Sequence, residues 1–397
     1  MDKELLSEFV EAVHSTRTVS GLTHNFYRYP ARFSPLFVRA AIRAFTKPGE
    51  LVLDPFAGSG TTLVEARVTG RRAIGVDISS LATFLARVKT SVFSNREIDE
   101  VLEWAIDVAE STNTASRLRN LAGWSGREHA DNVGGKLPWP IRKFLEGSLT
   151  RVTGLSDLRQ QRFARCILLK AGQWALDCRD EIPAVSEFRE RLLLEARSMA
   201  DGAREFARCA KNSDRQHKLE GHFRTLCLQR SAVGMHQDVR LKGEISPRLI
   251  LTSPPYPGVH VLYHRWQIQG RRETSAPFWI LGAKDGNGAS FYTLGDRKQR
   301  GQVSYFEQLR SAFESLRNLA NSQTTVIQQV AFPEPSKQLP RYLATLNDAG
   351  FHEVLLEGIA DSSDGRLWRS VPNRKWYATA KGSIPTSKEV VLLHRLK

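Results

Sequence analysis

The sequence predicts an α/β protein with a doubly wound, mostly parallel β-sheet that is interrupted by a long helical insertion. An apolar run at 51–53 is followed by a loop containing glycines, a helical segment at 61–67, a turn at Gly70 and a second apolar run at 73–76. This alternation predicts parallel strands joined by crossover helices. The strand pattern resumes later, with an apolar run at 249–251 and a further stretch at 324–332, whereas the chain between 93 and 224 has helical periodicity and few β-branched runs.

Two helices are predicted before the first strand. Residues 1–20 place apolar side chains at helical spacing. The stretch HNFYRYPARFSPLFVRAAIRAF, which begins at residue 24, is aromatic and basic around Pro30 and apolar in its second half. We expect a helix there with Ser34 as N-cap and Pro35 in the first helical position.

We divide the chain into three parts. Residues 1–92 contain the N-terminal helices and the first half of the sheet, residues 93–228 the helical insertion, and residues 229–397 the second half of the sheet. The clearest helices of the insertion are expected at 101–110, 162–178 and 188–210. In the last part we expect strands at 231–239, 248–251 and 324–332, a helix at 341–347 closed by Gly350, and a terminal antiparallel hairpin formed by 351–359 and 389–396.

Charge and cysteine content limit the classes of function. Lys and Arg (57) exceed Asp and Glu (42), which gives a net charge of +15 and favours a polyanionic partner such as nucleic acid. The alternative is a basic surface without a specific partner. The four cysteines are widely spaced and form no CxxC pair, so we expect neither a metal site nor a disulfide framework. The N-terminus lacks a signal-peptide pattern and no apolar run is long enough to span a membrane, so we expect no membrane partner and a cytoplasmic protein.

The motif DPFAGSGTT at 54–62 predicts a nucleotide-type site. Gly58 and Gly60 lie between a strand and a helix, where glycine permits a tight turn and a close approach of the backbone to a ligand. Asp77 ends the next predicted strand and suits the hydroxyls of a ribose. No lysine follows Gly60, and Asp54 suits a cationic or amino-bearing ligand better than a pyrophosphate. These features favour S-adenosylmethionine, and the alternative is a purely structural glycine turn.

The motif TSPPY at 252–256 predicts a holder for a planar amine. An exocyclic amine must rehybridise before it attacks a methyl group, and two acceptors assist this change: the Ser253 hydroxyl and the Pro254 carbonyl. Pro254 and Pro255 fix the backbone with little entropy left to lose. Tyr256 is expected to lie against the face of a base that has been flipped out of the duplex.

These segments resemble the amino-group DNA methyltransferases that use S-adenosylmethionine. DPFAGSGTTLVEA resembles their cofactor-binding motif, GVDIS their ribose-binding motif, HNFYRYPARFSPLFVRAAI their N-terminal cofactor-pocket motif, and TSPPY their catalytic (D/N/S)PP(Y/F) motif. The resemblance covers roughly residues 24–90 and 231–262. It implies a class I (Rossmann-like) methyltransferase fold with a mostly parallel seven-stranded sheet, and direct in-line methyl transfer to double-stranded DNA. It further implies a prokaryotic, nucleoid-associated protein and makes a cognate restriction endonuclease a candidate partner.

The resemblance also assigns the site residues. The catalytic residues are Ser253, Pro254, Pro255 and Tyr256. The cofactor-binding residues are Tyr29, Pro30, Phe33, Asp54, Pro55, Phe56, Gly58, Ser59, Gly60, Thr61, Thr62, Asp77, Ile78 and Asp238. Asp238 is expected where this fold often contacts the adenine amine of the cofactor, although an aspartate at a strand end that faces the surface explains it equally well.

Ser253 favours cytosine N4 as the acceptor, because serine before Pro-Pro is typical of the N4-cytosine members of this family. N6-adenine methylation remains an alternative, as do an amine in RNA and a DNA-binding relic without catalysis. Methylation of a cytosine ring carbon is excluded because no Pro-Cys pair occurs.

Target recognition is expected in the insertion, in residues 257–305, or in both. Residues 257–305 and the segment 366–377 interleave basic and aromatic residues, which suits contacts with phosphates and bases. The DNA contacts expected there are His264, Arg265, Trp266, Arg271, Arg272, Arg374 and Trp376. The alternative for residues 257–305 is a helix that packs Trp266 inward and leaves its arginines in solvent.

Overall fold

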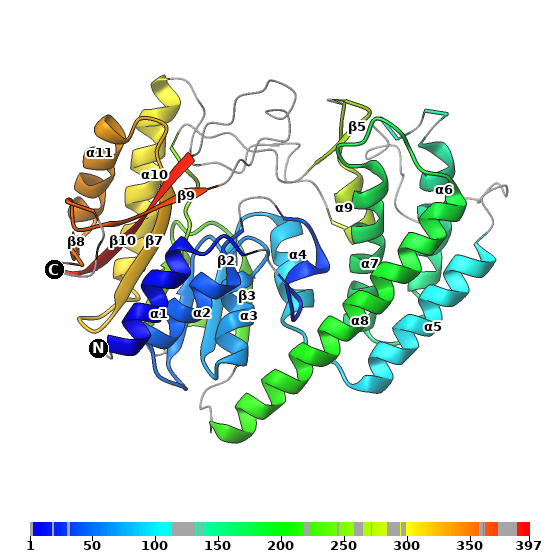
Figure 1. Cartoon of the computed structure of the whole chain (residues 1–397), viewed down its shortest axis with the longest axis horizontal. Coiled ribbons are helices and arrows are strands. Elements are labelled where there is room, and N and C mark those ends of the chain that lie inside the picture. Colours follow the sequence, from blue (N-terminus) through cyan, green and yellow to red (C-terminus); the bar gives the residue numbers. More distant parts are fainter. Residues whose placement is uncertain are drawn as a thin grey trace.

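The computed structural model describes residues 3–17, 20–29, 32–112, 132–133, 135–136, 138–217, 223–243, 246–257, 265–270, 272–283, 294, 299–356, 360, 362–371 and 387–397. The sheet with its flanking helices occupies one half of the molecule and the helices of the insertion occupy the other (Figure 1). This is the α/β, Rossmann-like methyltransferase fold with a helical insertion that the sequence predicts.

The main sheet has strand order β3-β2-β1-β4-β7-β10-β8. Its strands are β1 (Leu51–Asp54), β2 (Arg72–Asp77), β3 (Thr225–Gln229), β4 (Leu249–Thr252), β7 (Thr325–Ala331), β8 (Phe351–Glu353), β9 (Leu367–Val371) and β10 (Ser387–Leu396). The run from β3 to β7 is parallel, and β10 pairs antiparallel with β7. Among the residues that the structure describes, the sheet has eight strands rather than the predicted seven, because β8 and β9 share one edge of β10.

Helices cover both faces of this sheet, as a parallel sheet requires. Alternate residues of β1 point to opposite faces: Val52 joins a core with α1 (Lys3–His14), α2 (Pro35–Phe45) and α3 (Thr61–Val68). Leu51 and Leu53 join the opposite core, beneath α10 (Gln299–Arg317) and α11 (Pro335–Asp348). Ser34 and Pro35 precede and begin α2 as predicted, although the Ser34 side chain makes no capping hydrogen bond.

In the part of the insertion that the structure describes, the helices are α5 (Asn95–Ser111), α6 (Trp139–Val152), α7 (Leu158–Leu176) and α8 (Val185–Gln216). The expected helices at 101–110 and 188–210 lie within α5 and α8, and the one expected at 162–178 overlaps α7, which ends at Leu176; α6 was not predicted. A capping box begins α5, with Glu97 N donating to Ser94 Oγ at 3.2 Å and Ser94 N to Glu97 Oε2 at 2.7 Å. The core of the insertion also takes in α4 (Ser80–Lys89) and residues beside the short helix η1 (His24–Phe26). The insertion therefore packs directly against the N-terminal aromatic segment.

A small second sheet belongs to the same core. It consists of β5 (Trp266–Ile268) and β6 (Arg272–Thr274), and α9 (Ala276–Leu281) follows it. Figure 1 shows β5 and α9 beside α7, on the side of the molecule opposite to β10. Residues 265–270 and 272–283, which the sequence assigned to the second half of the sheet domain, thus pack with the insertion.

Two predictions about the second half of the sheet need correction. Residues 231–239 form no strand; they contain η2 (Met235–Gln237) and lead into η3 (Val239–Leu241). Gly234 there adopts a left-handed φ of 72°, which an extended strand does not permit. The strand is β3 (Thr225–Gln229), which overlaps the end of the range given to the insertion. The predicted helix begins earlier, at Pro335, because Pro340 is accommodated within it. The terminal antiparallel pairing of β8 with β10 is confirmed.

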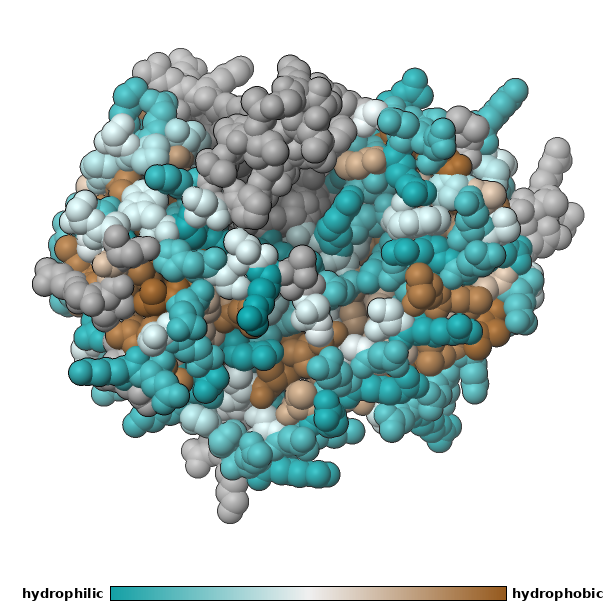
Figure 2. Space-filling view, viewed as in Figure 1, coloured by the Kyte–Doolittle hydropathy of each residue, from teal (hydrophilic) through white to brown (hydrophobic). Residues whose placement is uncertain are grey.

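Among the described residues, no helix is both long and apolar enough to cross a membrane. Figure 2 shows a face that is covered mostly by hydrophilic side chains, with separate apolar patches between them.

Candidate active site

The site lies where the sheet changes direction. From the central strand β1 the chain runs outward through β2 to β3 and returns on the other side of β1 as β4. The crevice beyond the carboxyl ends of such strands is where α/β sheets bind ligands. The glycine loop follows β1 and the TSPPY turn follows β4. The Thr252 hydroxyl donates to Asp54 Oδ1 at 2.9 Å, so the two motifs are joined by a direct hydrogen bond across 198 residues of sequence.

Asp54 fixes this junction. Its carboxylate also accepts hydrogen bonds from the Thr62 hydroxyl (2.6 Å) and from Phe56 N (3.1 Å). The side chain is only 1% exposed, and burial raises its pKa to about 7 despite these donors. Sequence reasoning gave Asp54 a contact with the cofactor. The structure gives it the separate task of holding the two loops at fixed distance.

The glycine loop depends on the absence of a side chain at two positions. Gly58 and Gly60 have φ values of 50° and 82°, which other residues rarely adopt. A Cβ on Gly58 would lie 3.3 Å from the Tyr29 ring, and a Cβ on Gly60 would lie 2.8 Å from Ala86 Cβ. The loop thus passes tightly between the N-terminal aromatic segment and α4. Its backbone N–H groups precede α3, an arrangement that suits a polar cofactor.

Asp77 closes the loop from the neighbouring strand. Its oxygens accept from Gly58 N and Ser79 N, both at 2.8 Å, and burial raises its pKa to about 6. A third backbone donor is Ile78, and because a carboxylate can accept about four hydrogen bonds, capacity remains for a ribose hydroxyl. Ile78, beside it, is 54% exposed and presents an apolar surface to a planar ring. These residues fit S-adenosylmethionine, and their contacts with it remain predictions.

Two buried charged residues near the loop were missed by the sequence analysis. Lys89 is fully buried, and among the described residues its ammonium has one hydrogen-bond partner, Ser59 Oγ at 3.0 Å. Burial lowers the pKa of Lys89 to about 7. Glu65 of α3 is also fully buried and bonds His24 (2.7 Å) and Arg39 (2.7 Å), which together hold its pKa below the usual range. Both lie on helices whose apolar neighbours predict only packing.

The TSPPY turn is held by hydroxyl groups and by one buried acid. The Ser253 hydroxyl donates to the Tyr256 hydroxyl at 3.3 Å, and Tyr256 donates to Glu389 Oε1 at 3.0 Å. Glu389, on β10, is 2% exposed and also bonds Gln329. The Tyr305 hydroxyl donates to the Pro255 carbonyl at 2.9 Å. The Ser253 hydroxyl therefore uses its hydrogen in the series of hydrogen bonds from Ser253 through Tyr256 to Glu389. The lone pairs of the Ser253 oxygen can then accept a hydrogen bond from another donor.

The remaining predicted cofactor residues are placed as follows. Pro55, Phe56, Ser59, Thr61 and Thr62 lie in or directly after the loop, with the side chains of Ser59, Thr61 and Thr62 buried. Phe33 packs against Phe37 of α2 with ring centroids 5.5 Å apart. Pro30 lies outside the described residues.

Asp238 is not at a strand end as predicted. It caps η3 and forms ion pairs with Arg230 (3.0 Å) and Arg240 (2.7 Å), which hold its pKa well below the usual range. Its carboxylate is thus occupied within its own turn, and nothing in this geometry supports the predicted contact with adenine.

The predicted DNA contacts are contradicted at Trp266. Its side chain is 1% exposed, its ring covers Gly172 of α7, and its indole N–H donates to the Tyr27 hydroxyl at 2.8 Å. It packs inward, as in the alternative interpretation, but from a strand instead of a helix. Arg265 is paired with Glu273 at 3.9 Å, and Arg272 is exposed on β6. His264, Arg271, Arg374 and Trp376 lie outside the described residues.

Comparison with known proteins finds one family model and several relatives that match part of the chain. Residues 6–83 match the N6/N4 methyltransferase family model described as "DNA methylase". The type II methyltransferase M.MjaII of Methanocaldococcus jannaschii is 28% identical over 117 residues, which are 30% of this chain and 21% of that protein. The DNA adenine methyltransferase YhdJ of Escherichia coli is 32% identical over 98 residues, which are 25% of this chain and 33% of that protein. The matches thus span a third or less of these relatives.

A methyltransferase of known structure from Agrobacterium tumefaciens, described as dependent on S-adenosylmethionine, overlaps 93% of this chain and 64% of its own. The TM-score is 0.32 and the identity 10%. A likeness of this size carries no weight, and the fold rests on the strand order described above.

Proposed function

We propose that this chain, whose residues 6–83 belong to the N6/N4 amino-group DNA methyltransferase family, transfers a methyl group from S-adenosylmethionine to an exocyclic amine of double-stranded DNA. One observation carries the proposal: the 2.9 Å hydrogen bond from Thr252 to Asp54 joins a cofactor-type glycine loop to the SPPY turn. A methyl donor in the first motif and an amine in the second would then meet at one end of the sheet.

S-adenosylmethionine supplies a methyl group on a sulfonium, which a neutral amine can attack directly. The backbone of the glycine loop would hold its methionine part, Asp77 its ribose and Ile78 one face of its adenine. Gly58 and Gly60 suit this role because both have a left-handed φ; Ala86 also leaves no space for a Cβ on Gly60, and the Tyr29 ring would crowd one on Gly58. The chain provides these contacts from preformed elements, so little order has to be gained on binding.

The SPPY turn would orient the acceptor amine. Ser253 uses its hydrogen toward Tyr256, so its oxygen can accept a hydrogen bond from the amine, and the Pro254 carbonyl is the second acceptor. The 3.3 Å contact is long for a bond between hydroxyls and is expected to shorten when substrate binds. Glu389 acts as a positioning residue, because it accepts from the Tyr256 hydroxyl and holds the ring that would lie against the base.

Cytosine N4 is the acceptor that we favour, because of the serine before Pro-Pro. Adenine N6 is the second candidate, since the relative YhdJ is named an adenine methyltransferase. We further propose that the insertion contributes to target recognition, and that a cognate restriction endonuclease is the partner to seek, since several relatives are named type II methyltransferases.

The test is transfer of a labelled methyl group from S-adenosylmethionine to duplex DNA by the purified protein. Ser253→Ala removes the acceptor oxygen, and we expect it to lower the rate by roughly 10- to 100-fold, the value of one well-placed hydrogen bond of about 1.5–3 kcal/mol. The binding of S-adenosylhomocysteine should stay unchanged. Ser363→Ala, in an exposed turn far from both motifs in sequence, is the matched control. A Ser253→Ala rate equal to that of the control would contradict the role of the turn.

A further inference from the structure

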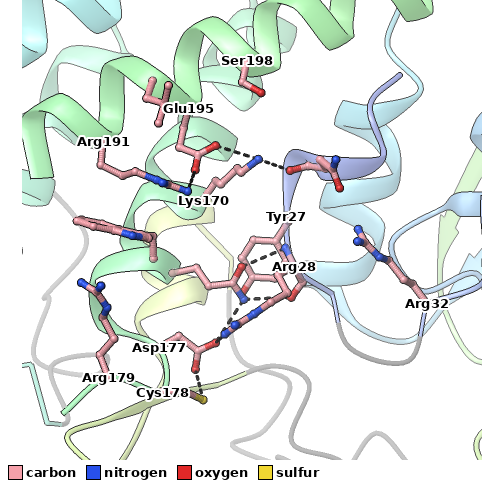
Figure 3. A pocket seen from close by; sticks show the side chains of 14 residues that line it. Tyr27, Arg28, Arg32, Lys170, Asp177, Cys178, Arg179, Arg191, Glu195 and Ser198 are labelled. Carbon is pink, nitrogen blue, oxygen red and sulfur yellow. Dashed lines mark hydrogen bonds and ion pairs between the residues drawn. The ribbon is translucent and has the colours of Figure 1, made fainter. Parts of the chain in front are cut away.

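A charged pocket lies between the N-terminal aromatic segment and the insertion (Figure 3). Its volume is about 690 Å³. Arg28 and Arg32 come from the N-terminal segment. The insertion supplies Lys170 from α7, Arg191 from α8, and Arg179 from the segment between these two helices. Counted over the described residues, and with Asp177 and Glu195 included, the lining holds five basic and two acidic side chains, a surplus of three positive charges.

The walls of the pocket are fixed to each other. The Gln173 side chain accepts from Arg28 N and donates to the Arg28 carbonyl, both at 3.1 Å, so α7 grips the backbone of the N-terminal segment. The Lys170 ammonium bonds the Asn25 carbonyl and also pairs with Glu195 at 2.9 Å. The shape of the pocket therefore exists before any ligand binds.

Its cations are held ready and only partly neutralised. Arg179 and Arg191 lie against the Trp174 ring, at 4.6 and 5.3 Å from its centroid, which restrains two otherwise flexible side chains. Arg28 pairs with Asp177 and Arg191 with Glu195. Within the described part of the chain, neither Arg32 nor Arg179 has a carboxylate at ion-pair distance: Arg32 donates to the His24 carbonyl, and Arg179 contacts Trp174.

We propose that this pocket binds consecutive phosphates of the DNA backbone, an inference that rests on the proposed function. A phosphodiester chain carries one negative charge per nucleotide, so neighbouring phosphates would neutralise several of these cations together. The planar guanidinium groups of arginine bind phosphate through paired hydrogen bonds. A single carboxylate, such as that of the cofactor, would leave most of the surplus uncompensated.

The position of the pocket agrees with this role. Arg28 and Arg32 flank Tyr29, whose ring lies against Gly58 of the cofactor loop. Backbone held here would therefore run beside the cofactor loop. The DNA backbone would also contact the insertion, so α7 and α8 would take part in DNA binding, whereas the buried Trp266 would not.

The experiment measures duplex binding as a function of salt concentration, by fluorescence anisotropy. Arg179→Gln removes a cation that leaves no acid unpaired. Loss of one phosphate contact lowers the slope of log K against log salt by about 0.9, which corresponds to about eightfold weaker binding at 0.1 M salt. Arg32→Gln should have a similar effect, and the double variant should lower the slope by about 1.8. Arg96→Gln, on exposed α5, is the matched control and should leave the slope unchanged.

Calorimetry with S-adenosylhomocysteine completes the test. The proposal is overturned if Arg179→Gln and Arg32→Gln keep the wild-type slope of log K against log salt. It is also overturned if they weaken the binding of S-adenosylhomocysteine while the binding of DNA stays intact. Failure of the proposed function is a separate result, in which the wild-type chain binds duplex with the full slope but transfers no methyl group. Circular dichroism of each variant establishes that it is folded.

Discussion

Replacing Lys89 by methionine should stabilise the protein at neutral and acidic pH. Lys89 is fully buried against Ser59, and its pKa falls from 10.5 to about 7 because burial disfavours the ammonium. At about 1.36 kcal/mol per pH unit, this difference corresponds to roughly 5 kcal/mol of lost stability at pH values below 7. Lys89→Met removes this cost but leaves the buried Ser59 hydroxyl without its partner, at about 1–3 kcal/mol. We therefore expect a net gain of roughly 2–4 kcal/mol at pH 6.

The pH dependence gives this prediction its sign. Because the pKa of Lys89 is lower in the folded state, the unfolded chain holds the extra proton between pH 7 and 10.5, and the wild-type protein gains stability over that range. Lys89→Met lacks this gain, so its advantage should shrink from pH 6 to pH 9.5. Urea unfolding at both values measures it, with the exposed Lys337→Met as control. A variant that is less stable than wild type at pH 6, with the same pH dependence, would refute the reasoning.

Three further predictions concern the loop and the turn. Gly60→Ala forces a left-handed φ on a residue whose Cβ would lie 2.8 Å from Ala86 Cβ; we expect a loss of roughly 2–5 kcal/mol in urea unfolding, and a loss below 0.5 kcal/mol would contradict it. Because the pKa of Asp54 is raised to about 7, the stabilisation that its protonated form gives the folded state is complete below about pH 4 and is lost as the pH rises to 7. The free energy of unfolding should therefore fall less for Asp54→Asn than for wild type between these pH values. Equal falls for the two proteins would contradict this prediction. Glu389→Gln replaces the charged acceptor of Tyr256 with a neutral one, which should lower the methylation rate about tenfold at unchanged cofactor affinity, and wild-type turnover would remove Glu389 from the account.

The sequence carried the parts of the fold that depend on local pattern. The strands at 51–54 and 249–252 are short, fully buried apolar runs bounded by glycine or proline, so they could be placed from composition alone. The helices α5, α7 and α8 could also be predicted, because their buried apolar residues recur at helical spacing. In contrast, α6 begins among prolines and contains Gly147, which obscure its pattern.

The parts that could not be predicted depend on contacts between distant residues. Trp266 lies in a three-residue strand, too short to show periodicity, and its partner Tyr27 is 239 residues away. The bond from Thr252 to Asp54 and that from Tyr256 to Glu389 likewise join separate parts of the chain. Motif spacing therefore located the loop and the turn, but it gave no access to the residues that hold them together.

Mass spectrometry of nucleosides tests the proposed methyl transfer most directly. The protein is expressed in a host without DNA methylation, and the host DNA is digested and searched for modified nucleosides. We predict N4-methylcytosine, which should disappear with Ser253→Ala. N6-methyladenine would keep the amine chemistry but contradict the base that Ser253 favours. DNA without any methylated amine, from cells that contain the folded protein, would contradict the proposed function itself.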